Sequence, residues 1–134
     1  MRFSNREQYG LRAMVELARR YGHGPVSLAE VAATQGISLS YLEQIVGALR
    51  RAGLLQSWRG VNGGYSLSVS PSRVTAADVI KALEGPLVPV KCVIDGRVEN
   101  CGRESGCAAR TVWQKVHERL EEALGSMTLA DLIG

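Results

Sequence analysis

The feature that most constrains the fold is a pair of short helical segments separated by one glycine. Residues 28–35 and 37–51 carry apolar residues at helical spacing, and Gly36 stands between them. The outer side of the second segment is polar, while its apolar side holds Leu42, Ile45, Val46 and Leu49. This pattern is typical of a helix-turn-helix. Any helical hairpin can produce this pattern, and the segment that follows distinguishes a helix-turn-helix from other hairpins.

Serines mark candidate starts for both helices. Ser27 and Glu30 have the spacing of a capping box, in which each side chain bonds the backbone N–H of the other residue. The second helix has two candidate N-terminal caps. Ser40 and Glu43 form a second possible box, and Ser38 is an equally good cap.

A β-hairpin follows directly. Gly53 ends the second helix, and residues 54–59 and 65–69 alternate like strands. Residues 60–64 read Gly-Val-Asn-Gly-Gly, which predicts a hairpin turn with Asn-Gly at its tip. A hairpin after a helix-turn-helix is a winged helix. Trp58 and Arg59 then lie on the wing, where a guanidinium fits the narrow minor groove of DNA.

Positive charge is concentrated in the first half of the chain. Residues 1–60 hold eight Arg against four Glu, and residues 61–134 hold eight Lys or Arg against nine Asp or Glu. A polyanion is therefore expected on the first half. The candidate DNA-contacting residues are Arg2, Ser38, Ser40, Tyr41, Glu43, Gln44, Arg50, Arg51, Arg59 and Asn62.

Glu43 is an acid on a helix face that is expected to meet DNA, and two interpretations stay open. It is the capping-box partner of Ser40, or it selects the DNA sequence. In the second case it repels phosphates unless a cytosine amine is offered to it.

Further helices are predicted at residues 6–21, 76–83 and 108–124. Thr75 with Asp78 is expected to cap the second of these, and Thr128 with Asp131 a last turn. The long helix has a large apolar stripe made of Ala109, Val112, Trp113, Val116, Leu120, Ala123 and Leu124. Such a stripe is most simply buried against a second copy of the chain. The alternative is that the helix folds back onto its own winged domain.

The three cysteines, Cys92, Cys101 and Cys107, lie in one glycine-punctuated loop with the spacing C-x8-C-x5-C. Thiolates on such a loop are suitable ligands for a metal or an iron–sulfur cluster. Two alternatives rank lower. The cysteines could be small buried residues, although the loop is rich in Gly, Glu and Arg, or they could hold zinc, although no CxxC knuckle is present.

Several function classes are excluded. The chain has no Ser-His-Asp set, no paired carboxylates for acid–base work and no phosphate-cradling loop, so an enzyme is not expected. It contains no apolar run long enough to span a membrane and no signal-peptide pattern. We therefore expect a cytoplasmic protein with reduced thiols.

The start Met-Arg-Phe-Ser, residues 37–44 (ISLSYLEQ), residues 59–65 (RGVNGGY) and three cysteines before a helix with Trp113 resemble the winged-helix iron–sulfur transcriptional regulators. This family includes IscR, the regulator of cluster biogenesis, which the recognition helix and wing resemble most, and NsrR, the nitric oxide sensor. The resemblance covers essentially the whole chain. It implies a homodimer on a palindromic DNA operator, with a [2Fe–2S] or [4Fe–4S] cluster on Cys92, Cys101 and Cys107.

The chain departs from the family pattern at the fourth ligand. Arg110 stands where IscR-like proteins have a histidine, and it cannot ligate because it stays protonated. NsrR-like proteins use an aspartate near the start of the first helix, where this chain has Gln8 beside Glu7. The candidates are Glu7, Gln8 and Glu104, with Asp95 and Glu99 also chemically possible.

The sequence thus predicts a mainly α-helical fold with a small β-hairpin wing and a long C-terminal dimerisation helix. Residues 1–85 form the winged-helix domain, 86–108 the cluster loop, and 109–134 the dimerisation helix and final turn. The predicted function is a cluster-controlled DNA-binding regulator, most simply a repressor, that senses iron–sulfur, redox or nitric oxide status. The alternative is a cluster-free regulator whose cysteine loop senses thiol oxidation or binds a partner protein.

Overall fold

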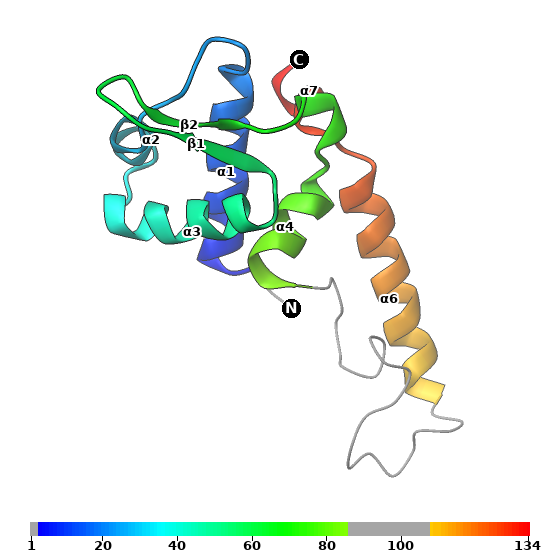
Figure 1. The fold of residues 1–134 in the computed structure, drawn as a ribbon. Coiled ribbons are helices and arrows are strands. Elements are labelled where there is room, and N and C mark those ends of the chain that lie inside the picture. Colours follow the sequence, from blue (N-terminus) through cyan, green and yellow to red (C-terminus); the bar gives the residue numbers. More distant parts are fainter. Residues whose placement is uncertain (1–2, 86–107) are drawn as a thin grey trace.

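Helices and one antiparallel hairpin make up the computed structural model, which describes residues 3–85 and 108–134 (Figure 1). The elements are α1 (Asn5–Arg19), α2 (Leu28–Gln35), α3 (Leu39–Arg51), β1 (Leu55–Trp58), β2 (Gly64–Leu67), a 3-10 turn η1 (Pro71–Arg73), α4 (Ala76–Glu84), α6 (Ala108–Gly125) and α7 (Leu129–Ile133). The order of α2, α3 and the hairpin is the predicted order of a helix-turn-helix followed by a wing.

The core lies between α1, α3 and α4. Residues three or four apart on α1 form its buried side, and α3 turns its predicted apolar side toward them. Residues without any exposed surface include Ala13, Met14, Leu42, Ile45, Val46, Leu49, Val74 and Val79. Burying these side chains supplies most of the driving force for folding.

The C-terminal segment closes back onto this core. Leu129 of α7 is completely buried in the same cluster as Met14 and Leu42. Two backbone hydrogen bonds fix it, from Leu129 N–H to Val74 O (2.8 Å) and from Ala76 N–H to Met127 O (2.9 Å). The residues after the long helix therefore belong to the packed core of the winged-helix part. The predicted division of the chain into three parts stays a prediction.

Among the described residues, the contacts of α6 with the rest of the chain come from its C-terminal part. Leu124 contacts the cluster of Ala77 and Ile80, and Lys81 pairs with Glu121 at 2.7 Å. Figure 1 shows α6 beside α4 at one end and running away from the core at the other. None of its residues is buried, and Val112 and Trp113 are 56% and 39% exposed. Most of the predicted apolar stripe thus remains uncovered in a single copy of the chain.

Two of the predicted capping boxes are present, and the box predicted at Ser27 is not. Thr75 with Asp78 and Thr128 with Asp131 form complete boxes. Ser27 makes no side-chain cap bond, and the Glu30 carboxylate pairs with Arg20 at 2.8 Å. That charge-assisted contact, led by its hydrogen bond, lowers the pKa of the Glu30 carboxyl.

The first helix and the strands are each a little shorter than predicted. Tyr21 lies outside α1, whose end at Arg19 precedes a turn with positive φ at Gly22 and Gly24. Among residues 3–85 and 108–134, no helix is both long enough and apolar enough to cross a membrane.

Candidate nucleic-acid interface

The turn between α2 and α3 fixes the direction of α3. Gly36 has φ 70° and ψ 34°, a left-handed conformation that glycine adopts easily, and it ends α2 as predicted. Ser38 then begins α3, because its Oγ accepts a hydrogen bond from the Tyr41 N–H at 3.2 Å. The alternative cap, Ser40 with Glu43, is not used. The interpretation of Glu43 as a capping partner is therefore wrong.

One face of α3 is polar and open to solvent. The exposed polar residues are Ser38, Ser40, Glu43, Gln44, Arg50 and Arg51, all predicted as DNA contacts. The opposite face is buried in the core, so the orientation of α3 is set by packing. Ser40 and Gln44 are one helical turn apart and share a face. This arrangement can present hydroxyl, amide and guanidinium groups to a DNA groove.

Tyr41 is the exception among the predicted contacts on α3. It is half-buried, and its ring meets that of Tyr9 edge-on, with the centroids 6.2 Å apart. The Arg12 guanidinium lies 5.2 Å from the centre of the Tyr9 ring. Tyr41 thus helps to pack α3 against α1, whatever contact its hydroxyl makes with DNA.

The wing is a short hairpin held firmly at its base. Leu55 pairs with Leu67, and Trp58 pairs with Gly64. Val26, which precedes α2, exchanges two backbone hydrogen bonds with Tyr65, at 2.8 and 2.9 Å. The indole N–H of Trp58 donates to Ser66 Oγ at 2.9 Å across the strands. These bonds tie the hairpin to the segment that leads into α2.

The tip of the turn differs from the prediction. The Gly63 N–H donates to Gly60 O at 3.0 Å, which makes Val61 and Asn62 the central residues. A side chain at Gly63 would meet the backbone oxygen of Trp58, and one at Gly64 would meet the backbone of Val26. The two glycines are therefore required by close backbone approaches. The Asn-Gly pair consequently spans the second half of the turn and is not its centre.

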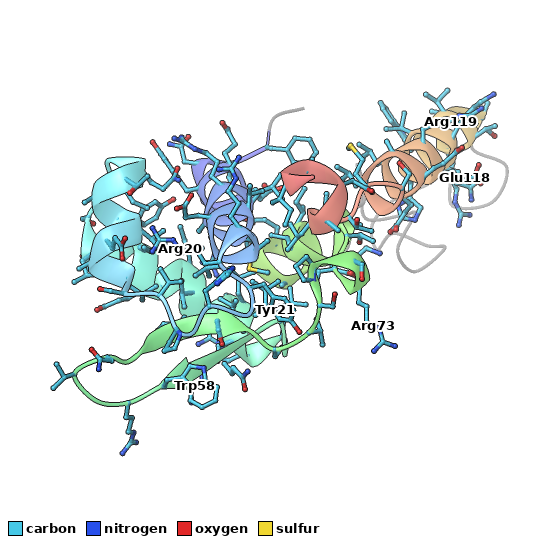
Figure 2. The ribbon with its side chains drawn as sticks, turned by 90° about the horizontal axis from the view of Figure 1, so that it is seen from above. Arg20, Tyr21, Trp58, Arg73, Glu118 and Arg119 are labelled. Carbon is cyan, nitrogen blue, oxygen red and sulfur yellow. The ribbon has the colours of Figure 1, made fainter. Side chains whose placement is uncertain are left out.

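The wing tip and the start of α3 lie toward the same side of the molecule in Figure 1. Arg59 and Asn62 are exposed there, as predicted. Figure 2 shows the Trp58 side chain on the hairpin, on a different side from Arg73 and from Arg119 of α6. The exposed face of α3 and the wing can therefore contact one DNA duplex together.

Two exposed apolar residues on this surface were missed by sequence reasoning. Leu39 is 41% exposed in the first turn of α3, and Val61 is fully exposed at the wing tip. Apolar side chains can contact thymine methyl groups or wedge into the minor groove. The sequence signal that could have identified Leu39 and Val61 is their position between residues that were predicted to face outward.

The predicted metal ligands fall in two places. The loop residues Cys92, Asp95, Glu99, Cys101, Glu104 and Cys107 lie outside the described residues, as does Arg2, which is a predicted DNA contact. Glu7 is buried, and its Oε1 accepts hydrogen bonds from the backbone N–H of Ser4 (2.9 Å) and from Ser4 Oγ (3.1 Å). Gln8 is exposed and donates to Phe3 O at 3.0 Å. Within the described segments, no three His, Cys, Asp or Glu side chains gather as metal ligands.

Comparison with known proteins gives consistent results. The sequence profile of the Rrf2 family, described as an iron-dependent transcriptional regulator, matches residues 3–134. The HTH-type transcriptional regulator CymR of Bacillus subtilis is 42% identical over 132 residues, which cover 98% of this chain and 89% of that protein. The solved structure of CymR, the global cysteine regulator of B. subtilis, matches with a TM-score of 0.83 at 41% identity, and the match covers 99% of this chain and 96% of that chain.

Two further solved structures match along nearly the whole chain. IscR of T. potens has a TM-score of 0.80 at 39% identity, covering 99% of this chain and 86% of that chain. The oxidized form of Staphylococcus aureus CymR has a TM-score of 0.79 at 34% identity, covering 99% and 96%. The predicted mainly helical fold with a hairpin wing is confirmed by these matches.

Proposed function

The chain belongs to the Rrf2 family of DNA-binding transcriptional regulators, and we propose that an iron–sulfur cluster on its cysteine loop controls operator binding. The family resemblance predicted from the sequence is confirmed, and the members of this family are regulators that are not enzymes. The observation that carries the cluster proposal is the donor set, because all three cysteines stand within residues 92–107, directly before α6.

On DNA, α3 lies in the major groove and the wing in the minor groove. Ser38, Ser40 and Gln44 reach base edges, while Arg59 enters the minor groove. Arg2, Arg50 and Arg51 contact phosphates. What supports this assignment is that α3 exposes only one face, while its other face is fixed in the core.

Two copies of the chain bind a palindromic operator as a homodimer. The support is the apolar stripe on α6, which its own chain leaves mostly uncovered. A patch of nearly pure apolar surface is lined by Val116, Leu120 and the side chains of Lys115 and Arg119. Pairing of two α6 helices buries this patch and fixes the distance between the two α3 helices. Two half-sites on DNA demand such a fixed spacing.

Cys92, Cys101 and Cys107 hold the cluster through their thiolates, and its fourth ligand comes from Glu7, Gln8 or Glu104. To ligate, Glu7 has to leave its cap on Ser4, whereas Gln8 is already exposed. A bound cluster supplies an iron that oxidants or nitric oxide can attack and that is lost when iron is depleted. Ligation ties the cysteine loop to α6, so that the spacing of the α3 helices depends on cluster occupancy.

The test compares anaerobically purified protein with a Cys92→Ala, Cys101→Ala, Cys107→Ala triple variant at one salt concentration. Iron, sulfide and visible absorption verify the cluster, and operator affinity is measured for both forms. We expect the affinities to differ for at least one operator. Equal affinities on every operator tested, with an intact cluster, would refute control by the cluster and leave the DNA-binding fold untouched.

A second candidate function is a cluster-free regulator that senses oxidation through its thiols. The favouring observation is the similarity to CymR, a protein whose solved structures include an oxidized form. In this case two cysteine thiols form a disulfide and give two electrons and two protons to hydrogen peroxide, which is reduced to two waters. Protein without iron that changes its operator affinity on peroxide treatment, and recovers it with a thiol reductant, would support this second function.

A further inference from the structure

Two glycines lie inside the helices of the described chain, Gly10 in α1 and Gly47 in α3. A glycine in a helix interior lowers the folding equilibrium constant about fivefold relative to alanine, because the unfolded chain loses more freedom on folding. Each of these glycines therefore calls for a physical reason.

Gly10 has its reason in the core. A methyl group at this position would collide with Cδ1 of Leu83 and would lie 3.4 Å from Cγ2 of Ile45. Gly10 thus lets α1 and α4 approach closely. Leu83 is itself buried, so this packing has little room to adjust.

Gly47 has no such reason. Its φ is that of an ordinary helical residue, and a methyl group there would approach only Nη1 of Arg51, at 3.3 Å. That atom is the far end of a flexible side chain on the surface and can move away. Packing within the protein therefore favours alanine at position 47.

The position of Gly47 suggests what requires it. It lies on the outer face of α3, one turn after Glu43 and one turn before Arg51. It is also seven residues beyond Ser40, or roughly 10 Å along the helix axis toward the C-terminus. The N-terminal residues of a recognition helix contact base edges, so its later turns lie nearer the rim of the groove.

We infer that Gly47 is a DNA-contact position at which the sugar–phosphate backbone lies against the main chain of α3. The missing side chain gives room for this approach, and the Arg51 guanidinium that lies beside Gly47 donates to the adjacent phosphate. The inference rests on the proposed docking of α3 in the major groove. It adds a backbone contact, which carries no sequence information of its own.

The test is Gly47→Ala, with Gly125→Ala as the matched control. Gly125 is exposed at the end of α6, and a methyl group there would meet nothing within 4 Å. Thermal unfolding is measured at one protein concentration. Binding is measured by fluorescence anisotropy at one salt concentration, with a random-sequence duplex and with a duplex that the wild-type protein selects from a randomised pool.

We expect Gly47→Ala to raise the unfolding temperature by a few degrees and to weaken binding at least fivefold on both duplexes. Gly125→Ala should leave binding unchanged. In an Arg51→Ala background the effect of Gly47→Ala on binding should shrink, because the two changes disturb one phosphate contact.

Unchanged affinity of Gly47→Ala on both duplexes would overturn the inference. A loss confined to the selected duplex would overturn the backbone contact, because it would indicate contact with bases. A lowered unfolding temperature would contradict the argument that the fold favours alanine. If the wild-type protein selected no duplex from the pool and did not bind the random-sequence duplex, the proposed docking of α3 would fail, and the inference with it.

Discussion

Arg59→Ala tests the role of the wing with little disturbance of the fold. Arg59 directly follows β1 and is exposed, and its side chain has no hydrogen bond or ion pair with the part of the chain that the structure describes. Removing the side chain therefore takes no contact away from the folded protein. We expect the free energy of unfolding to change by less than about 0.5 kcal/mol, as at other exposed sites.

The expected effect on binding is much larger. A guanidinium that contacts DNA contributes about 1–3 kcal/mol, so each half-site should lose roughly five- to 150-fold in affinity. A dimer on two half-sites loses the contact twice, in total about 2–6 kcal/mol. The magnitude depends on how well the wing holds its arginine. The two bonds between Val26 and Tyr65 keep the base of the hairpin in place.

The assay is a DNA titration followed by fluorescence anisotropy at a fixed salt concentration, with Arg73→Ala as the matched control. Arg73 is also exposed but lies on a different side of the molecule from the hairpin (Figure 2). If both variants weaken binding equally, the effect is one of net charge and not of the wing. Unchanged operator affinity of Arg59→Ala would remove the wing from the interface.

Three further predictions test the site and the fold. Glu43→Ala should bind a wider set of duplexes more tightly, because Glu43 is exposed and is not used as a cap; a selection from randomised DNA that returns an identical or narrower set would refute this. Gly10→Ala should destabilise the protein by about 1–3 kcal/mol through overpacking against Leu83, and an unchanged midpoint of urea denaturation would contradict it. The Thr128 backbone N–H donates to the Asp131 carboxylate and lowers the pKa of that carboxyl. The contribution of this hydrogen bond to stability is therefore present above the ordinary Asp pKa of about 3.9 and is lost as the pH falls through the lower pKa of the folded state. The stability advantage of the wild-type protein over Asp131→Asn should therefore shrink as the pH falls below about 4, and an advantage that is constant with pH would count against the cap.

The local elements of the fold could be predicted because local sequence decides them. Gly36 ends α2 since the chain needs a left-handed residue there, and the Thr75 and Thr128 boxes form because both partners are three residues apart. The helical spacing of apolar residues on α3 also identified its exposed face correctly. Most of the predicted DNA contacts are exposed in the structure for this reason. Their contact with DNA, and the ligation of a cluster by the cysteines, stay predictions.

Contacts between residues far apart in the sequence could not be predicted. Glu30 had two possible partners, and the packing of α1 against α2 brings Arg20, rather than the Ser27 N–H, to its carboxylate. In the same way, Tyr41 looked like a surface residue on α3 until packing placed Tyr9 against it. The local sequence is compatible with either partner of Glu30 and with an exposed or a packed Tyr41. The position of another helix determines which of these occurs.

The sequence by itself determined which segments are helices and which face of each is apolar. Tertiary structure decided which of those faces are covered. The core buries the apolar side of α3 and closes over Leu129 of α7, yet it leaves most of the stripe on α6 open. The physical reason is that periodicity gives a helix an apolar side, whereas burial requires a second surface, and the position of that surface depends on the whole chain.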